Sequence, residues 1–364
     1  MLKPAGLDEW QSWYDSTPVA SCFQSPDWAR LWSQYTGGKY QPAPLLARLS
    51  SGKTVLMPLS RQLVMRGLGS AWHAAPAGTY GGWLTGTNRA LNGKHTAELI
   101  RELLSHCGSL TYRWFPFMVT DSGKETLRYD SQSGTLEGVT NWIDYSKDLK
   151  PALKQMTVIP DHTRVLDCSD GYDSIIRDKQ WRSRIQPMLN KAAKLGVTVR
   201  QASTMWDWER YHKRYLDTAT GWDPPPSHIY SMHFFRLLAD LPECRLWLAE
   251  IAGKPVAGAI VLYGRNHTTY WHGASDHSHR SAGAANLLIS RLIEDNCSRG
   301  QRWFDFNPSM GISGVDAFKR SFGAIAVEAP VLEKMSGPFR FLRWVSRKRA
   351  SITGAQTVDS GSPS

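Results

Sequence analysis

The chain of 364 residues is 41% hydrophobic and 21% charged, a composition typical of folded globular proteins that excludes disordered, collagen-like and coiled-coil classes. Lysine and arginine number 43 against 32 acidic residues, and the formal net charge of +11 favours a polyanionic partner such as nucleic acid, nucleotide phosphate or anionic lipid. The length exceeds what one hydrophobic core usually fills, so we expect two domains of about 150–180 residues.

The first half predicts a mixture of helices and strands. Residues 7–35 indicate helical structure, and a helix should begin at Pro26 because Ser25 can cap it and proline fits the first helical position. The remaining elements follow in chain order: a hairpin of strands 44–49 and 54–59, a loop over 72–86 rich in small residues, a helix at 95–106, and strands at 109–115 and near 138–145.

The second half alternates helices with a sheet that contains a hairpin. A strand ends at Asp167, and a long helix from Asp173 to Leu195 should be kinked or split by Pro187 and closed by Gly196. The later elements are strand 197–200, helices 204–217 and 228–239, hairpin strands 245–251 and 255–262, strand 267–274, helix 282–299, strand 303–306 and helix 314–322.

Four motifs in fixed order accompany these elements. They read Phe23-Gln24-Ser25-x-x-Trp28-Ala29, then His162-Thr163-Arg164-Val165-Leu166-Asp167, then a basic helix ending Lys191-Ala192-Ala193-Lys194-Leu195-Gly196-Val197, and finally Phe304-Asp305-Phe306-x-x-Ser309 with Gly314-x-x-x-Phe318-Lys319-x-x-Phe322-Gly323-Ala324 behind it. Over residues 20–330 this pattern resembles the FemAB-like group of the Fem/GNAT superfamily.

The resemblance implies a mixed α/β (α+β) fold of two tandem GNAT-like, acyl-CoA N-acyltransferase, domains. We expect an N-terminal domain at residues 1–155, a C-terminal domain with the transfer site at 156–336, and a basic amphipathic segment with a disordered tail at 337–364. The amphipathic segment could contact an anionic membrane at its periphery, or pack as a terminal helix with a charged outer face.

The resemblance also implies an enzyme that moves an aminoacyl group from aminoacyl-tRNA to a primary amine and forms an amide bond. An alternative is a GNAT N-acyltransferase that uses acyl-CoA and acts on a small-molecule or saccharide amine. A further alternative is a non-catalytic RNA- or lipid-binding protein on a degenerate transferase fold. Salt-sensitive tRNA binding without turnover would favour the last of these.

Lys319 and Asp305 are the candidate catalytic residues. In the family, the lysine of the Phe-Lys pair lies at the acyl-transfer centre, where an ammonium favours the tetrahedral oxyanion over the neutral ester. Asp305, at a strand end, could orient Lys319 or accept the proton of the amine. The alternatives are a lysine that extends over the core and an aspartate that caps backbone.

Substrate-binding candidates lie on three nearby segments. Phe318 precedes the lysine, and Tyr270 and His272 alternate with Trp271, so they should share one face of their strand. Arg280 and Gly283 fit the R-x-x-G-x-A spacing that holds a pyrophosphate at a helix start. A helix start of small residues that packs closely on the sheet explains the same pattern.

The basic helix supplies the candidate tRNA contacts, which are Arg177, Arg182, Arg184, Lys191 and Lys194. Arg177, Arg184 and Lys191 recur every seven residues and should form one stripe on an unbroken helix. A solvent-exposed helix face explains these charges equally well.

Cysteine usage and the N-terminal sequence bear on location and metals. The five cysteines are dispersed without metal-ligand spacing, which predicts reduced thiols in a cytoplasm and no metal. The sequence has no Walker or Rossmann pattern, and we expect no bound cofactor. No apolar run is long enough to span a membrane, and Asp8 and Glu9 interrupt any signal-like core, so we expect a cytoplasmic protein.

Overall fold

A computed structural model describes residues 1–64, 69–86, 91–117, 142–219, 229–309 and 311–337, without the side chains of 143–145, 277 and 280. The chain divides into a first unit, residues 1–162 with 327–364, and a second unit, residues 163–326. These limits differ from the expected boundaries at 155/156 and 336/337. The terminal segment at 338–364, expected to be basic and amphipathic, lies outside the described residues. No helix in the described ranges has the length and apolarity to cross a membrane.

The first unit contains two sheets and four of the helices that the structure describes. The helices are α1 (Leu7–Ser16), α2 (Pro26–Tyr35), α3 (Gly93–His106) and α4 (Trp142–Leu153). A three-stranded sheet has the order β1-β3-β4, with β1 at Leu2–Pro4, β3 at Leu45–Arg48 and β4 at Thr54–Met57. A six-stranded sheet has the order β2-β5-β6-β7-β16-β8, with strands at Tyr40–Pro42, Ser60–Val64, Gly69–His73, Leu110–Arg113, Val331–Lys334 and Thr157–Ile159.

In the first unit, the predicted start of one helix is confirmed and one predicted strand is wrong. The Ser25 hydroxyl accepts a hydrogen bond from the Trp28 amide at 3.1 Å, so α2 begins at Pro26 as the cap predicts. The prediction of a strand near 138–145 is wrong for the described residues of this range, because α4 begins at Trp142. Its buried residues, Trp142, Leu149 and Ala152, have helical rather than alternating spacing.

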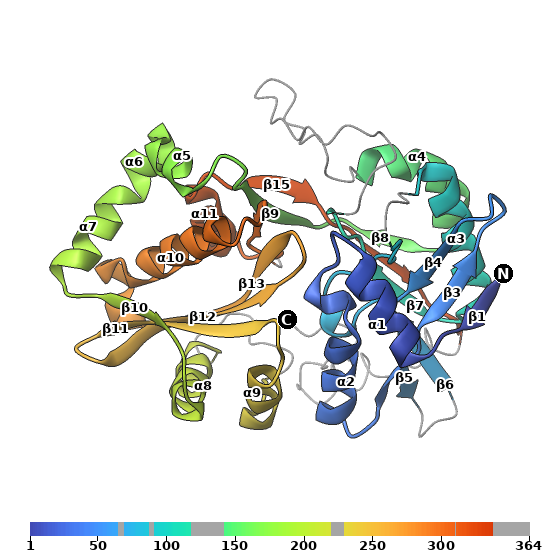
Figure 1. Ribbon diagram of the computed structural model, residues 1–364, viewed down its shortest axis with the longest axis horizontal. Coiled ribbons are helices and arrows are strands. Elements are labelled where there is room, and N and C mark those ends of the chain that lie inside the picture. The colour runs from blue at the N-terminus through green and yellow to red at the C-terminus, as the bar shows by residue number, and fades with distance from the viewer. Residues whose placement is uncertain (65–68, 87–90, 118–141, 220–228, 310, 338–364) are drawn as a thin grey trace, which may run out of the picture. The chain divides into compact units, whose positions relative to one another are not determined.

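The second unit is one seven-stranded sheet with helices on both faces (Figure 1). The strand order is β10-β11-β12-β13-β14-β9-β15, with strands at Thr198–Gln201, Cys244–Ile251, Lys254–Tyr263, His267–Ser275, Trp303–Asp305, His162–Asp167 and Ile325–Glu328. Helices α8 (Met205–Ala219) and α9 (Met232–Ala239) cover one face, and α10 (Ala284–Ser298) covers the other. Helix α11 (Ser313–Ser321) lies on the α10 side (Figure 1).

The long helix expected from Asp173 to Leu195 is three short helices. They are α5 (Tyr172–Arg177), α6 (Lys179–Arg184) and α7 (Gln186–Lys194). The Asp178 carboxylate caps a new start by accepting from the amides of Gln180 and Trp181, and Pro187 lies in the first turn of α7. The split before Pro187 was expected, but the break at Asp178 was not. Gly196 closes α7 at φ 67°, as expected.

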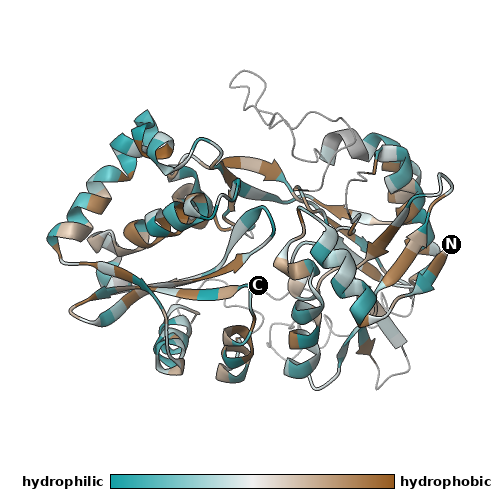
Figure 2. Cartoon of the chain, viewed as in Figure 1, coloured by the Kyte–Doolittle hydropathy of each residue, from teal (hydrophilic) through white to brown (hydrophobic). Residues whose placement is uncertain are grey.

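Hydrophobic residues follow the strands, and polar residues are prominent on α5–α7 (Figure 2). The core between the sheet and α10 includes Val261, Leu288, Ile289, Phe304 and Phe306. This core fixes β13, β14 and α10 relative to one another, and the candidate residues lie around them.

Candidate functional site

Strands β13 and β14 separate at the centre of the second unit. They pair in parallel from His267↔Trp303 to Thr269↔Asp305, after which β13 continues to Ser275 while β14 ends. The chain then turns through Phe306 and Asn307 toward α11. The candidate catalytic residues Asp305 and Lys319 lie before and after this turn.

Asp305 is completely buried and serves as a hydrogen-bond hub. Its carboxylate accepts from the Thr163 hydroxyl at 2.5 Å, from the Thr269 hydroxyl at 3.2 Å and from the Asn307 amide at 3.0 Å. These donors come from β9, β13 and the turn after β14. Asp305 therefore ties two strands to the turn that leads toward Lys319.

Asn307 adopts a left-handed backbone conformation, with φ at 60°. Residues other than glycine rarely adopt this conformation, so neighbouring contacts must hold it. The hydrogen bond from its amide to Asp305 supplies one such contact. The turn consequently directs the carbonyls of Asn307 and Pro308 toward α11.

Lys319 is buried, with 3% of its surface exposed, at the end of this chain of contacts. Its Nζ donates to the Asn307 carbonyl at 2.6 Å and to the Pro308 carbonyl at 3.2 Å. Half-buried Phe318 packs on Phe322 with ring centroids 5.2 Å apart. The structure thus brings Asp305, Lys319 and Phe318 together through the 305–308 turn.

Helix α11 is anchored by an ion pair that sequence reasoning missed. The Arg164 guanidinium donates to both Asp316 carboxylate oxygens, at 2.8 and 2.7 Å. Thr163 and Arg164 belong to the quoted His162-Thr163-Arg164 motif, but their partners are 142 and 152 residues away in the chain. The motif indicated that these residues matter, but the neighbouring sequence does not indicate which side chains they bind.

The expectation that Tyr270 and His272 share a face is wrong. The pairing of β13 with β12 shifts by one residue, because His272 lies opposite Ile260 while Tyr270 lies opposite Val261. Trp271 is the extra residue of this β-bulge, and bulges change the side on which later side chains emerge. Tyr270 therefore packs near Phe306 on the α10 side, and His272 contacts α8 and α9.

His272 is a neutral imidazole held by Tyr211 of α8. Burial lowers the pKa of His272 to about 4, so the ring is neutral at neutral pH, and its Nδ1 shares a hydrogen bond of 2.6 Å with the Tyr211 hydroxyl. Burial also raises the pKa of Tyr270 to about 12, which keeps this phenol protonated. Tyr270 can therefore donate a hydrogen bond at neutral pH, and the two side chains lie on opposite faces of β13.

Gly283 is explained by close packing between helices. It caps α10 with φ at 74°, and a Cβ there would lie 2.3 Å from the Met188 carbonyl of α7. The tight approach of α7 fits the packing explanation of this small-residue segment. The side chain of Arg280 lies outside the described residues, so a phosphate-binding role for Arg280 and Gly283 stays a prediction.

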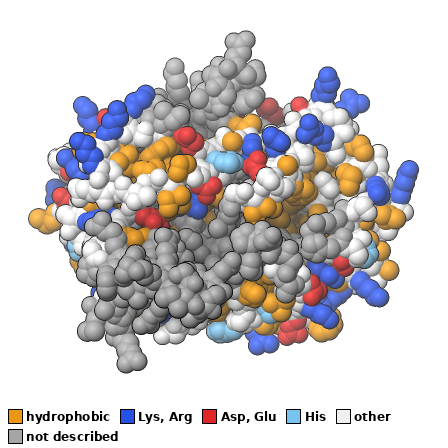
Figure 3. Space-filling model, turned by 180° about the vertical axis from the view of Figure 1, so that it is seen from behind, with side chains coloured by type: hydrophobic (Ala, Val, Ile, Leu, Met, Phe, Trp, Pro, Cys, Tyr) orange, Lys and Arg blue, Asp and Glu red, His pale blue; other side chains and the backbone are white. Residues whose placement is uncertain are grey.

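The five candidate tRNA contacts are exposed but do not form the expected stripe. Arg177 lies on α5, Arg182 and Arg184 on α6, and Lys191 and Lys194 on α7, so the breaks at Asp178 and Ile185 interrupt the seven-residue spacing. None of the five forms an ion pair with another described residue. Among the described residues on the face shown in Figure 3, Lys and Arg side chains are interspersed with acidic and hydrophobic side chains.

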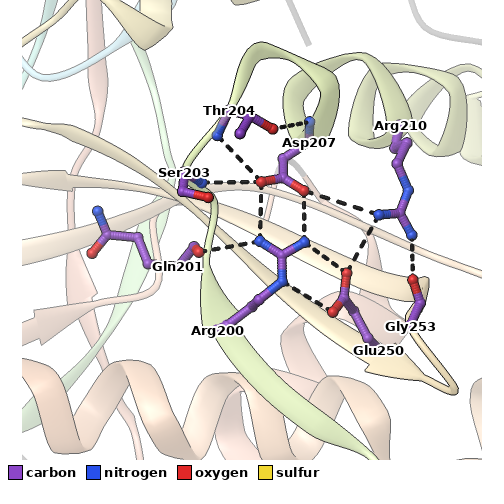
Figure 4. Close-up of polar contacts among 8 residues, drawn as sticks. All are labelled: Arg200, Gln201, Ser203, Thr204, Asp207, Arg210, Glu250 and Gly253. Carbon is purple, nitrogen blue, oxygen red and sulfur yellow. Dashed lines mark hydrogen bonds and ion pairs between the residues drawn. The ribbon is translucent and has the colours of Figure 1, made fainter.

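A second polar cluster, also missed from the sequence, joins α8 to the edge of the sheet (Figure 4). Arg200 of β10 donates to Asp207 at 2.6 and 3.0 Å and to Glu250 at 2.9 and 3.0 Å, while Arg210 lies 3.6 Å from Glu250. The hydrogen bonds from Arg200 hold the pKa of Asp207 well below its usual range. Every charge here is matched, which indicates a structural role.

Replacing Arg200 with methionine should lower the free energy of unfolding by about 1–3 kcal/mol at pH 7, because it leaves buried Asp207 without its main donor. Asp207 stabilises the fold above the unfolded-state pKa of about 4, and this contribution is lost as the pH falls toward the lowered folded-state pKa. The difference from wild type should therefore narrow below about pH 4.

Urea titrations at several pH values measure this effect. Arg236→Met is the matched control, because Arg236 forms an exposed ion pair with Glu209 at 3.4 Å and its loss should change stability by less than about 1 kcal/mol. A difference between the Arg200 variant and wild type that stays constant down to pH 3 would contradict the assignment.

Comparisons with known proteins agree with this architecture. Residues 179–320 match an acetyltransferase (GNAT) domain. The crystal structure of FemX is 12% identical, covers 95% of this chain and 99% of its own, and superimposes with a TM-score of 0.63. Comparison with curated protein sequences gives no match.

Two further structures share the fold at a similar distance. L-PGS from Bacillus licheniformis is 11% identical, with 93% of this chain and 96% of its own covered and a TM-score of 0.53. The C-terminal domain (DUF2156) of a putative lysylphosphatidylglycerol synthetase from Agrobacterium fabrum is 10% identical, with 95% and 97% covered and a TM-score of 0.53.

The class of fold is two GNAT-type domains in tandem, a mixed α+β arrangement. The sequence motifs resemble those of the FemAB-like group of the Fem/GNAT superfamily, and the fold shared with FemX agrees with that resemblance.

Proposed function

We propose that this protein transfers an aminoacyl group from aminoacyl-tRNA to a primary amine, forming an amide bond. The observation that carries the proposal is the buried Lys319 ammonium, fixed by the Asn307 and Pro308 carbonyls beside the point where β13 and β14 separate. The GNAT-type acyltransferase fold supports acyl transfer in general. A neighbour named for lysylphosphatidylglycerol synthesis supports an aminoacyl group.

In the proposed step, the amine attacks the ester carbonyl and the tRNA hydroxyl leaves. Negative charge develops on the carbonyl oxygen in the tetrahedral intermediate, and the Lys319 ammonium stabilises it more than it stabilises the neutral ester. An aminoacyl ester is already activated, so positioning and oxyanion stabilisation supply most of the catalysis.

Asp305 acts as a positioning residue in this scheme. It is fully buried and already accepts three hydrogen bonds, which supports orientation of the Asn307 turn over proton acceptance from the substrate. Tyr270, His272 and Phe318 remain candidate substrate contacts. Tyr270 would donate a hydrogen bond rather than act as a general base, because burial keeps its phenol protonated.

An acyl-CoA donor is the second candidate. It is favoured by the match to an acetyltransferase domain, whose range includes Arg280 and Gly283. The first test is to incubate the protein with charged tRNA pools and, separately, with acyl-CoAs, and to measure donor consumption. Consumption of acyl-CoA alone would replace the proposal with the second candidate, and tRNA binding without turnover would favour a non-catalytic RNA-binding protein.

Arg184→Ala tests the proposed tRNA contacts on α6. Loss of one phosphate contact should weaken tRNA binding severalfold and lower the slope of log affinity against log salt by about 1. The single-turnover rate at saturating donor should stay near the wild-type rate, because Arg184 is exposed on α6, whereas the carbonyls of Asn307 and Pro308 hold Lys319.

The control for this variant is Arg291→Ala, which removes the same charge from α10, where Arg291 pairs with Glu294. If the control weakens tRNA binding as much as Arg184→Ala does, net charge rather than a defined contact explains the effect. The proposed tRNA-binding role of α6 would then be withdrawn.

A further inference from the structure

The first turn of α6 holds the last turn of α11. The side-chain amide of Gln180 donates to the Arg320 carbonyl at 2.6 Å and to the Ser321 carbonyl at 3.4 Å. The last four carbonyls of an α-helix lack the amide partner that the next turn would supply, so a donor from outside the helix can bind them. Gln180 therefore caps the C-terminal end of the helix that carries Lys319.

Trp181 adds an aromatic contact at the same place. Its buried ring packs on the ring of Phe322 with centroids 5.7 Å apart, and Phe322 also contacts Phe318 and Phe306. Phe318 immediately precedes Lys319, and Phe306 begins the turn after β14. One hydrogen-bonding and one aromatic side chain of α6 thus reach the surroundings of the lysine.

The break at Asp178 sets the position of both side chains. The Asp178 carboxylate accepts from the amides of Gln180 and Trp181 and starts a new helix there. A side-chain cap fixes the backbone of the residues whose amides it accepts. The unexpected restart of the helix therefore places Gln180 and Trp181 against α11.

The other half of α11 has an anchor of its own. The ion pair between Arg164 and Asp316 ties its first turn to β9, and Lys319 lies between Asp316 and Arg320 on the helix. Two anchors, from β9 and from α6, therefore lie on either side of the lysine along α11. Such supporting contacts hold a reactive group in its productive geometry, here with Nζ 2.6 Å from the Asn307 carbonyl.

We propose that Gln180 is a positioning residue of the transfer reaction, which holds the end of α11 on α6 and thereby keeps the Lys319 ammonium in place. Gln180 acts through α11 and not on the reacting atoms. Its role in the rate rests on the proposed function, whereas its role in placing Lys319 does not. A displacement of about 1 Å can lower a rate about 10²-fold, so losing one of two anchors should lower it about tenfold.

Gln180→Met tests the effect on the rate, because it keeps the length of the side chain and removes the donor. The single-turnover rate at saturating charged tRNA should fall about tenfold, while the affinity for charged tRNA should stay within about twofold of wild type. Gln180→Lys returns a donor to the end of the helix and should recover most of the rate. Gln186→Met is the matched control and should keep the wild-type rate, because Gln186 donates to Asn190 within α7.

A second measurement needs no substrate. The full-length protein is treated with a limiting amount of acetic anhydride, and acetylation of Lys319 is measured by mass spectrometry against exposed Lys191 as the internal reference. Buried Lys319 should react slowly in wild type and in Gln186→Met. It should react severalfold faster in Gln180→Met, because release of the end of α11 exposes the amine.

The two measurements separate failure of this inference from failure of the proposed function. Equal acetylation of Lys319 in wild type and Gln180→Met would overturn the inference, with or without transfer activity. Faster acetylation at an unchanged transfer rate would overturn the positioning role. If the wild-type protein consumes no charged tRNA, the proposed function fails, and acetylation alone decides whether Gln180 places Lys319. If Gln180→Met does not fold, Gln180→Glu, which has the same length and no amide donor, takes its place.

Discussion

Replacing Lys319 with methionine is expected to lower turnover by about 10²–10³, the usual effect of removing one oxyanion donor. Methionine fills the same volume beside Phe322 and preserves the fold. The Asn307 and Pro308 carbonyls lose a donor, so stability should fall by about 1–2 kcal/mol. Donor binding should change far less than the chemical step, which single-turnover rates at saturating donor measure directly.

Two further variants make the Lys319 result specific. Lys319→Arg should recover little activity, because a planar guanidinium does not place a compact charge where Nζ lies, 2.6 Å from the Asn307 carbonyl. Arg320→Met removes the exposed neighbouring cation and should leave the rate within about twofold of wild type. A Lys319→Met enzyme that transfers as fast as wild type would end the catalytic assignment.

Replacing Asp305 with asparagine is expected to lower the free energy of unfolding by roughly 2–4 kcal/mol and to lower turnover as well. The asparagine amide group would face hydroxyl and amide donors that the carboxylate now accepts. With the Asn307 turn released, the carbonyls that hold Lys319 lose their fixed position. Urea titration measures the first effect, and single-turnover kinetics measure the second.

The shape of the pH–rate profile distinguishes positioning from proton transfer. If Asp305 positions the turn, the Asp305→Asn profile should keep its wild-type shape at a lower rate. If Asp305 accepts the proton, the rate of the wild-type enzyme should rise with pH as its carboxyl group ionises. Loss of that low-pH rise in the Asp305→Asn profile would make Asp305 the proton acceptor. Thr269→Val is the matched control, because it removes only the 3.2 Å hydrogen bond and should cost about 1 kcal/mol or less.

Features set by neighbouring residues were predictable from the sequence. The Ser25 cap, the hairpin turn before Lys254 and the end of α7 at Gly196 depend on a few adjacent residues, and each lies where it was expected. The breaks in the basic segment were only partly predictable. Pro187 signals its break directly, whereas Asp178 acts through a side-chain cap that competes with continuation of the helix.

Features set by pairing between distant segments were not predictable. The bulge at Trp271 exists only in the register of β13 against β12, so alternation along the strand alone placed His272 on the wrong face. The same limit applies to the candidate site. The motifs identified Lys319 and Asp305. The hydrogen bonds of Thr163, Arg164 and Asn307 join residues that are distant in the chain, so no local sequence pattern predicts them.

The place of β16 in the first unit has a consequence for synthesis on the ribosome. β16 lies inside the six-stranded sheet, where it pairs with both β7 and β8, yet it is the last strand in the part of the chain that the structure describes. When β8 emerges, the neighbour that will hold it has not been translated, and all of residues 163–326 must come first. The nascent chain should therefore complete its second unit before its first, contrary to the usual N-terminal-first order.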